Sequence, residues 1–415
     1  MHPSPTLIQA EHLLDVVAGG WVHDARIVVE DGRIAAILGP DDPTPDALSV
    51  LRPTGAWVIP GLIDCHSHQV GDIEDAGVPA TMTSASEEAL IGVRNARTTL
   101  AAGFTTVRDV GSYRAFVDVE LQHAIDAGWT PGLRMQCCGA MVTSPGGGGD
   151  VTGLARDIAL PHDLRFGVVS TPHEMREKVR ALIGGGAGVI KLIVTGAVLT
   201  RGTKPGFVEL DAPMIEAAVE EAWRQGVYVA AHAHGTEGIK VAIRAGVRSI
   251  EHGSLIDDEG IELLKRHGTY LVADVYDGDW IAEEGARAGW PAETMAKNDM
   301  TTQAQRDGFT KAVKAGARIA FGTDSGVYPH GRNAIQFGYQ VRLGQSPLEA
   351  VRSATIVAAE CMGWEDRVGS ARQGRFADLV AFEADPLADV EELRSPSTVI
   401  KGGASPHRRR GSSFG

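Results

Sequence analysis

The sequence predicts an α/β protein, a (β/α)8 TIM barrel that carries a small β-sandwich domain built from both chain ends. Two observations support this fold. Short apolar runs alternate with segments of helical period from about residue 57 to 362, and β-rich stretches without helical period lie on either side. Apolar strands separated by helices pair in parallel, and eight such units close into a barrel. An open, doubly wound sheet is the alternative fold.

The predicted small domain combines residues 1–58 with residues 366–405. In its first half, Asp31-Gly32 marks a hairpin turn between two apolar runs. In its second half, Phe376–Phe382 and Thr398–Lys401 again have the pattern of strands. The barrel, predicted at residues 59–365, would be inserted between these halves. We expect the basic residues 406–415, which include Gly and Ser, to form a flexible tail.

Eight apolar runs are the candidate barrel strands. They are Ala56–Ile63, Thr105–Val107, Leu133–Cys138, Val189–Val194, Val227–Ala231, Ser249–Ile250, Tyr270–Ala273 and Arg318–Phe321. Helical period predicts helices between them, including Ala85–Ala102, Pro172–Ile183, Ala212–Arg224 and Thr236–Ala245. The C-terminal strand ends of a barrel face one mouth, where active sites lie. Polar residues at these ends are therefore the functional candidates.

Composition limits the partners that we expect. The chain has 415 residues and a formal net charge of −14, so a nucleic acid would be repelled. No apolar run is long enough to cross a bilayer, which argues against a membrane partner. The first residues lack the pattern of a secretory signal, and four cysteines do not make a disulfide framework. We therefore expect a soluble, cytoplasmic protein.

The strongest local signal is a pair of histidines, His66 and His68, directly after an apolar strand. Residues two apart on a strand point the same way, so the two imidazoles could share a metal ion. Three further strand ends carry similar groups. These are His232 and His234 after the fifth strand, His252 after the sixth and Asp324 after the eighth. Their convergence at one mouth predicts a metal centre.

Lys191 stands within the apolar run Gly188–Val194. Burying a lone ammonium group is costly, so a lysine in this position favours a special role. A neutral amine can add carbon dioxide to form a carbamate, whose anionic oxygens could bridge two cations. A salt bridge to a neighbouring acid is the simpler alternative.

With these residues in this order, the sequence resembles the binuclear amidohydrolase superfamily. The resemblance covers nearly the whole chain, including Pro60–Asp64 and the closing segment Gly374–Val380. The segments His232–Ile239 and Gly322–Gly326 are similar to the branch of Xaa-Pro dipeptidase-like and imidazolonepropionase-like enzymes. That branch also includes carboxypeptidases for N-acyl amino acids and ochratoxin-hydrolysing amidases.

The resemblance implies two divalent metal ions and indicates which residues would bind each of them. His66, His68 and Asp324 would hold the more buried ion, His232 and His252 would hold the second, and a carboxylated Lys191 would bridge them. We expect zinc, while manganese, iron or cobalt would also accept these ligands. The resemblance also implies a homo-oligomer.

One loop departs from the branch. Many relatives carry a histidine in a Gly-Gly-His-Gly-Asp loop after the third strand, where it is thought to polarise the substrate carbonyl. Here the loop reads Gly146-Gly147-Gly148-Gly149-Asp150, with Gly148 at the histidine position. This difference makes an ordinary prolidase activity less expected, and another donor or another substrate would account for it.

Several residues near the predicted mouth are candidates for binding the substrate. They are His234, Tyr276, Tyr328, His330 and Arg332. An arginine can bind a carboxylate through two hydrogen bonds, so the group favours an anionic product such as a free amino acid. The segment from about 276 to 305, with Trp280, Trp290 and Met295, is long enough to form a lid over an apolar acyl group, or else forms helix core.

We therefore expect an amide hydrolase that releases a C-terminal amino acid from an N-acyl amino acid or dipeptide, including amides with a bulky aromatic acyl group of the ochratoxin type. A hydroxide bridging both metals would attack the carbonyl, and Asp324 would carry the proton to the leaving nitrogen. His234 is the second candidate catalytic residue. The alternatives are an imidazolonepropionase-like opening of a cyclic amide, or a degenerate barrel that binds metal or ligand without turnover.

Overall fold

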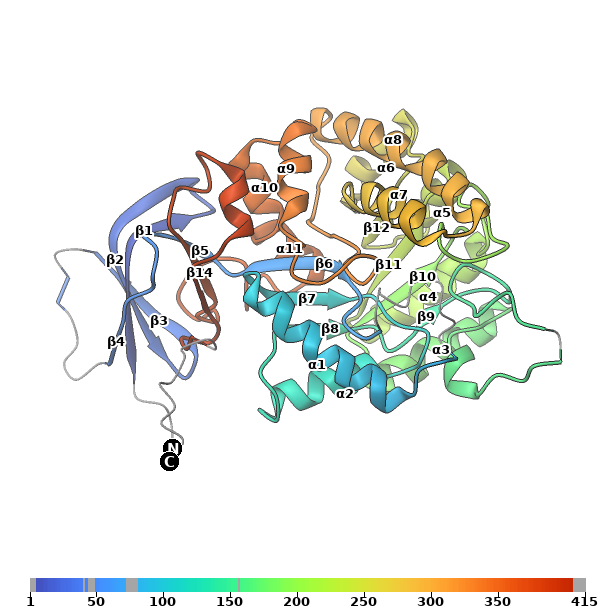
Figure 1. The fold of residues 1–415 in the computed structure, drawn as a ribbon, viewed down its shortest axis with the longest axis horizontal. Helices are drawn as coiled ribbons and strands as arrows, with labels where there is room; N and C mark the ends of the chain where they lie inside the picture. Colours follow the sequence, from blue (N-terminus) through green and yellow to red (C-terminus); the bar gives the residue numbers. More distant parts are fainter. Residues whose placement is uncertain (1–4, 40–41, 44–48, 72–80, 156, 406–415) are drawn as a thin grey trace.

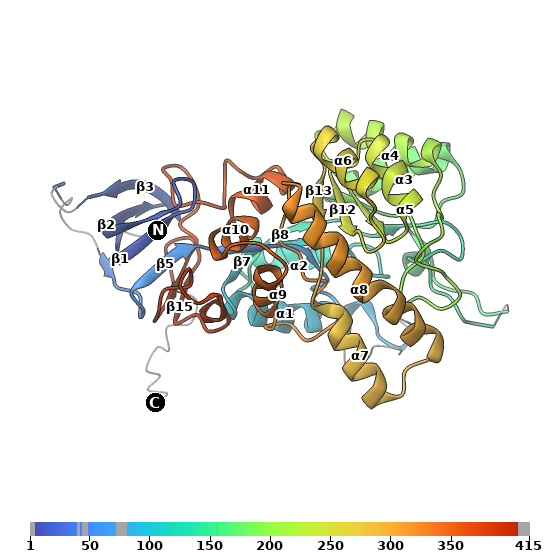
Figure 2. The same ribbon diagram turned by 90° about the horizontal axis from the view of Figure 1, so that it is seen from above.

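The computed structural model describes residues 5–39, 42–43, 49–71, 81–155 and 157–405. The predicted tail at 406–415 lies outside these residues. In two perpendicular views, a small β-sheet lies at one end of the molecule and a larger body of parallel strands and helices makes up the rest (Figures 1 and 2).

The small sheet contains strands from both ends of the chain. It has seven strands in the order β15-β14-β5-β1-β2-β3, with β4 paired to β1. Their bounds are β1 Thr6–Asp15, β2 Gly20–Glu30, β3 Arg33–Leu38, β4 Ser49–Leu51, β5 Trp57–Pro60, β14 Leu379–Phe382 and β15 Thr398–Ile400. The predicted Asp31-Gly32 hairpin is confirmed, since Glu30 pairs with Arg33 and both turn residues have positive φ. The described strands form one hydrogen-bonded sheet rather than the two separate sheets of the predicted sandwich.

The larger body contains two parallel sheets. One has the order β6-β7-β8, and the other has the order β13-β12-β11-β10-β9. Their bounds are β6 Leu62–Ser67, β7 Phe104–Asp109, β8 Arg134–Cys137, β9 Met141–Val142, β10 Val189–Ile193, β11 Tyr228–Ala233, β12 Ser249–His252 and β13 Tyr270–Val272. The predicted parallel pairing is thus confirmed for these strands.

Further hydrogen bonds connect the two parallel sheets on both sides. The segment 318–325 lies between β13 and β6 and forms parallel bridges to Leu271 and Ser67. On the opposite side, the amide of Gly188 donates to the carbonyl of Cys137 at 2.8 Å. This connectivity follows the strand order that the predicted barrel requires, although isolated contacts replace continuous ladders at both joins.

Two predicted strands differ from the structure. The first, Ala56–Ile63, is split at Gly61 between the small sheet (β5) and the parallel sheet (β6). A Cβ atom at Gly61 would lie 2.1 Å from Thr105 Oγ1, so the close approach of the chain at this point requires glycine. The eighth, Arg318–Phe321, forms bridges but no regular ladder.

Helices surround the parallel strands, and the four that were predicted individually are found within one residue. The described helices are α1 Ala85–Ala101, α2 Val117–Asp126, α3 Pro172–Gly184, α4 Ala212–Arg224, α5 Thr236–Arg244, α6 Asp258–His267, α7 Asp277–Ala288, α8 Ala292–Lys314, α9 Ile335–Arg342, α10 Pro347–Ser353 and α11 Ile356–Met362. Side chains of Ser84, Thr171 and Asp211 accept from the third amide of their helices, which explains three of the starts. The proposed lid segment is helical, since it contains α7 and the start of α8.

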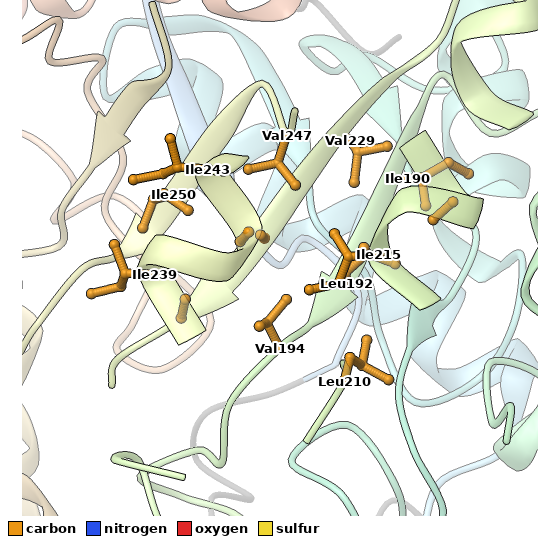
Figure 3. Close-up of a cluster of buried hydrophobic side chains, with 14 of the residues drawn as sticks. Ile190, Leu192, Val194, Leu210, Ile215, Val229, Ile239, Ile243, Val247 and Ile250 are labelled. Atoms are coloured by element: carbon orange, nitrogen blue, oxygen red, sulfur yellow. The ribbon is translucent and has the colours of Figure 1, made fainter. Parts of the chain in front are cut away.

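The main core fixes which way β10 faces. Ile190, Leu192 and Val194 alternate along the chain and pack in one buried cluster with side chains of α4 and α5 (Figure 3). Burying each of them stabilises the fold by about 1.5–3 kcal/mol. Successive side chains of a strand point to opposite faces, so Lys191 points away from these helices and toward the interior of the parallel strands.

Among the described residues, no helix is both long and apolar enough to cross a membrane. Cys65, Cys137, Cys138 and Cys361 are free and buried.

Candidate metal centre

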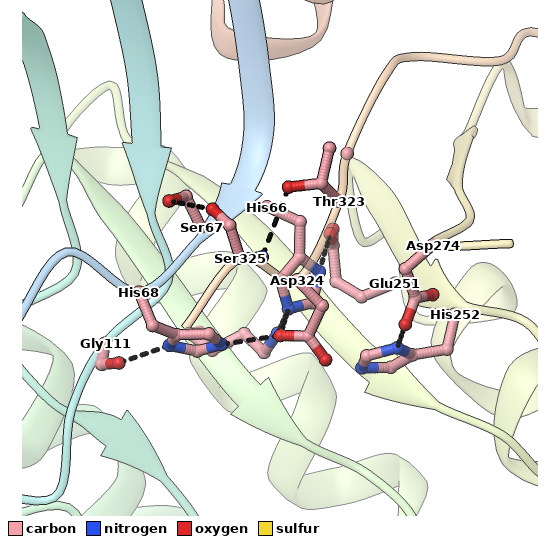
Figure 4. Close-up of polar contacts among 12 residues, drawn as sticks. His66, Ser67, His68, Gly111, Glu251, His252, Asp274, Thr323, Asp324 and Ser325 are labelled. Atoms are coloured by element: carbon pink, nitrogen blue, oxygen red, sulfur yellow. Dashed lines mark hydrogen bonds and ion pairs between the residues drawn. The ribbon is translucent and has the colours of Figure 1, made fainter. Parts of the chain in front are cut away.

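The predicted ligands lie together at the C-terminal ends of the parallel strands. His66 lies in β6, His232 in β11 and His252 at the end of β12, while Asp324 lies in the segment 318–325, which bridges β13 and β6. Potential ligand atoms of His66, His252 and Asp324 all lie within 4.8 Å of one another, and those of His232, His234 and His252 form a second such group. His252 belongs to both groups, so the two adjoin. Figure 4 shows the first group, with His66, His252 and Asp324.

His68 also faces the carboxylate of the first group, so that two imidazoles, those of His66 and His68, approach Asp324. Asp324 Oδ1 lies 3.0 Å from His68 Nε2 and 3.3 Å from His66 Nε2. This buried oxygen has no partner with hydrogen-bond geometry among the described residues. Ligand atoms about 2.0–2.2 Å from one ion lie about 3.0–3.6 Å apart, so the three atoms fit a shared divalent cation. Burial raises the pKa of Asp324, but His66 and His68 outweigh it and hold the pKa well below its usual range.

The other ring nitrogen of each of these histidines is already engaged. His66 Nδ1 lies 2.8 Å from Glu251 Oε2, and His68 Nδ1 lies 2.5 Å from the carbonyl oxygen of Gly111. Both acceptors require Nδ1 to carry the hydrogen, which leaves the lone pair of Nε2 for a metal. His66 and His68 therefore have both the tautomer and the spacing that binding a metal ion requires.

The second group consists of three imidazoles. The ring centroids of His232 and His252 are 4.5 Å apart, and those of His234 and His252 are 4.6 Å apart. Burial and the neighbouring His252 lower the pKa of both His232 and His234 well below its usual value. These two rings are therefore neutral at neutral pH, the form in which imidazole binds metal.

Each ring of the second group also has a polar partner. His252 Nδ1 lies 2.8 Å from Asp274 Oδ2, and His234 Nδ1 lies 2.7 Å from Ser254 Oγ. His232 Nε2 lies 3.3 Å from the carbonyl oxygen of Gly196. Burial raises the pKa of Asp274, but His252 lowers it by more, to about 2.

Lys191 lies beside the first group. Its side chain is 1% exposed, and Nζ lies 3.5 Å from His66 Nε2. Burial lowers the pKa of Lys191, against the opposing effects of Glu251 and Asp324. Lowering the pKa favours the neutral amine, which is the form that reacts with carbon dioxide. The environment of Lys191 thus favours carboxylation, and its bridging role stays a prediction.

Two of the ligands have an unusual backbone. His252 and Asp324 have φ of 67° and 57°, in the left-handed region that residues other than glycine rarely adopt. For Asp324, the amide donates to the carbonyl of His66 at 2.8 Å, and the preceding Thr323 binds the buried Asp64 carboxylate through its amide and hydroxyl. Burial raises the pKa of Asp64 to about 6. Strained conformations of this kind concentrate at functional sites.

The predicted substrate-binding residues have different environments. Tyr276 and Tyr328 are buried and meet edge to face with centroids 5.0 Å apart, and the Tyr328 hydroxyl has no hydrogen-bond partner among the described residues. Arg332 is exposed and lies 4.8 Å from the Trp280 ring. His330 contacts Thr99 Oγ1 at 3.0 Å and the carbonyl of His68 at 3.1 Å, so it supports a ligand.

Gly148 lies in a closely packed loop. A Cβ atom there would lie 3.0 Å from Ile193 Cγ2 and 3.1 Å from Ala197 Cβ. The amide of Gly148 donates to Glu209 Oε2 at 2.7 Å, and its carbonyl accepts from Thr200 Oγ1 at 2.6 Å. A histidine in this position would require the loop to shift.

Sequence reasoning missed three residues of the site. Asp274 directly follows the strand that was predicted at Tyr270–Ala273, so the strand-end rule could have found it. Glu251 precedes a predicted ligand, but its contact with His66 joins residues far apart in the sequence. Arg108, which binds Glu251, gave no sequence signal beyond a charge in an apolar strand.

Parallel strands that collect imidazoles and a carboxylate at their C-terminal ends are characteristic of metal-dependent hydrolases. Residues 57–405 match the amidohydrolase family, and the chain belongs to this family. The family generally uses a binuclear metal centre and hydrolyses amide bonds. Its fold implies a TIM barrel with a small domain, in agreement with the predicted class rather than with an open sheet.

Three known proteins illustrate the similarity. Ochratoxinase of Aspergillus niger is 33% identical over 93% of this chain and 83% of its own length. Imidazolonepropionase of Micrococcus luteus is 26% identical over 88% of this chain and 89% of its own. The solved structure of a Xaa-Pro dipeptidase with methionine bound in its active site has a TM-score of 0.90 and 33% identity, and covers 97% of this chain and 99% of that one. They fit the branch that the sequence resembles.

Proposed function

We propose that this protein is a metal-dependent amidohydrolase that releases a C-terminal amino acid from an N-acyl amino acid or a dipeptide. The substrates would include amides with a bulky aromatic acyl group of the ochratoxin type. The observation that carries the proposal is the pair of adjoining ligand groups, which share His252 at the ends of the parallel strands.

The chain's own residues supply a ligand set for two ions. His66, His68 and Asp324 would hold one ion, His232 and His252 the other, and carboxylated Lys191 would join them. Zinc is the expected metal, because imidazole and carboxylate ligands suit it. When bound, the two ions would polarise the scissile carbonyl and activate a water molecule.

Asp324 is the proposed proton carrier. Its lowered pKa keeps the carboxylate ionised at neutral pH, so it can accept a proton from the attacking water. It would then deliver this proton to the departing nitrogen, because an amide nitrogen leaves poorly without one. His234 is neutral and held through Nδ1 by Ser254, so its Nε2 can face the substrate carbonyl.

The amino acid product is supported by the positive charge and hydroxyl groups beyond the ligands. Arg332 and the Tyr328 hydroxyl are the proposed contacts for the carboxylate of the product, and Tyr276 packs against Tyr328. The methionine bound in the related Xaa-Pro dipeptidase structure is consistent with such a product. The similarity to ochratoxinase supports an aromatic acyl group.

Opening of a cyclic amide is the second candidate. It is favoured by the 26% identity to imidazolonepropionase and by Gly148, which stands at the position of the loop histidine of dipeptidase-like relatives and is closely packed against Ile193 and Ala197.

The test is a substrate panel with metal-loaded enzyme. N-acetyl-phenylalanine, ochratoxin A, an Xaa-Pro dipeptide and a cyclic imidazolone would be incubated separately, with Lys191→Ala as the control. We expect free amino acid from at least one linear amide and much slower release by the variant. Ring opening alone would favour the second candidate. No turnover with two ions bound would mean that the site binds without catalysis.

A further inference from the structure

A chain of buried charged groups lies behind the metal centre. Arg108 of β7, Glu251 of β12 and His66 of β6 are each no more than 1% exposed. Arg108 Nη2 lies 2.8 Å from Glu251 Oε1, and Glu251 Oε2 lies 2.8 Å from His66 Nδ1. Three strands that are distant in sequence thus meet through side chains in the interior (Figure 4 draws the Glu251–His66 end).

The remaining hydrogen bonds hold this chain in one geometry. Arg108 Nε donates to the carbonyl of Cys65 at 2.6 Å, and Nη1 donates to Ser249 Oγ at 3.1 Å. Ser249 Oγ in turn donates to Glu251 Oε1 at 2.5 Å. Both carboxylate oxygens are therefore engaged, and the ion pair with Arg108 compensates a charge that has no contact with solvent.

Within the described part of the chain, no lysine or arginine pairs with the corresponding carboxylate of the other half. Asp274, which accepts from His252 Nδ1, receives its second hydrogen bond from the neutral amide of Gln305 at 2.7 Å. The arginine is therefore a specific feature of the His66 side. A fully charged carboxylate with both oxygens fixed is a stronger and better oriented acceptor than one with a neutral partner.

We propose that Arg108 and Glu251 are positioning residues for the metal ligand His66. Glu251 accepts the Nδ1 hydrogen and so fixes the tautomer and ring orientation that present Nε2 to the ion. Arg108 holds Glu251 in place and supplies its counter-charge. The inference rests on the proposed metal-dependent function, but it concerns metal binding and not the choice of substrate.

The test is metal affinity without substrate. Apoprotein would be titrated with Zn²⁺ against a chromogenic chelator, and the Co²⁺-loaded form would be examined by visible absorption. We expect Glu251→Gln and Arg108→Gln to weaken the affinity of one ion by about 10–100-fold and to shift the Co²⁺ spectrum. Arg108→Lys, which keeps the charge but loses the forked donors, should lose less affinity than Arg108→Gln.

Arg134→Gln is the matched control, because Arg134 also pairs with a buried carboxylate, that of Asp378 at 2.7 Å, just before β14 of the small sheet. It should lower the melting temperature and leave affinity and spectrum unchanged. Unchanged affinity in Glu251→Gln and Arg108→Gln, or an equal loss in the control, would overturn the proposal. If those two variants fail to fold, Ser249→Ala tests the proposal instead, because it removes one hydrogen bond to Glu251. A Co²⁺ spectrum of this variant identical to that of the parent protein would overturn the proposal.

The two proposals can fail separately. A chain that hydrolyses none of the panel substrates refutes the proposed function, while the affinities still decide whether Arg108 and Glu251 position His66.

Discussion

The two halves of the candidate centre use different chemistry. On one side, His66 and His68 face the ionised carboxylate of Asp324, and His66 is supported by an ion pair. On the other side, the ligand atoms come from imidazoles alone, and burial together with His252 lowers the pKa of His232 and His234 well below the usual value. One half therefore brings negative charge to an ion and the other does not, so we expect the two ions to differ in affinity and in their response to pH.

Removing the charge of the first half should have the largest effect. Asp324→Asn keeps the shape but loses both the anionic ligand and the proton carrier, so we expect kcat/KM to fall by at least about 10³-fold. Kinetics and metal analysis would be carried out on the same preparation. Near-native turnover with full metal occupancy would contradict the role of Asp324 and the contrast between the halves.

The link between the halves can be broken at Lys191. We expect Lys191→Ala to weaken the binding of one of the two ions by about 10–100-fold, because the variant cannot form the proposed bridging carbamate. Lys191→Glu restores an anionic oxygen and should recover part of the binding, while Lys191→Met would not. Equal metal content in all three variants, measured by elemental analysis, would show that this side chain is no ligand.

As the pH falls, we expect the two halves to lose metal affinity at different pH values. Burial and Lys191 lower the pKa of His66, but Asp324 and Glu251 raise it by more, so His66 takes up a proton at a higher pH than a free histidine. The pKa values of His232 and His234 are lowered, so these rings stay neutral further into the acid range. Protons compete with the metal, so affinity at the first half should decline first as the pH falls below neutrality. Simultaneous release of both ions in a pH titration would remove this distinction.

The smallest expected effect concerns the partner of His234. Ser254→Ala removes one hydrogen bond, worth about 1 kcal/mol, and should lower kcat/KM by about fivefold. Thr99→Val is the matched control, because Thr99 Oγ1 contacts His330 Nδ1, and His330 Nε2 contacts the backbone carbonyl of His68 rather than its imidazole. It should reduce thermal stability slightly without changing kcat/KM. Equal kinetic effects would show that Ser254 has no particular role in orienting His234.

Much of the centre could be predicted, because strand ends obey a simple rule. His66, His232, His252 and Asp324 each follow an apolar run, and parallel strands bring such positions to one edge. Asp274 obeys the same rule and could have been included.

The supporting contacts could not be predicted in the same way. The meeting of Arg108 with Glu251 depends on which interior positions of two non-neighbouring strands lie at the same height, and no local pattern encodes that. The split at Gly61 was missed for a related reason, since an uninterrupted apolar run does not show that its two halves pair with different sheets.

That split also bears on the order in which the molecule is assembled during synthesis. β5 leads through Gly61 directly into the strand of His66, and β5 pairs with β14, where Ile59 lies opposite Val380. A nascent chain that has emerged as far as the last helix still lacks this neighbour for β5. β1, which emerges first, already pairs with β5, so β14 completes the pairing of β5 rather than starting it. We therefore expect the anchoring of the first ligand strand to be complete only after β14 has left the ribosome, which would make full metal capture a late event in the maturation of the protein.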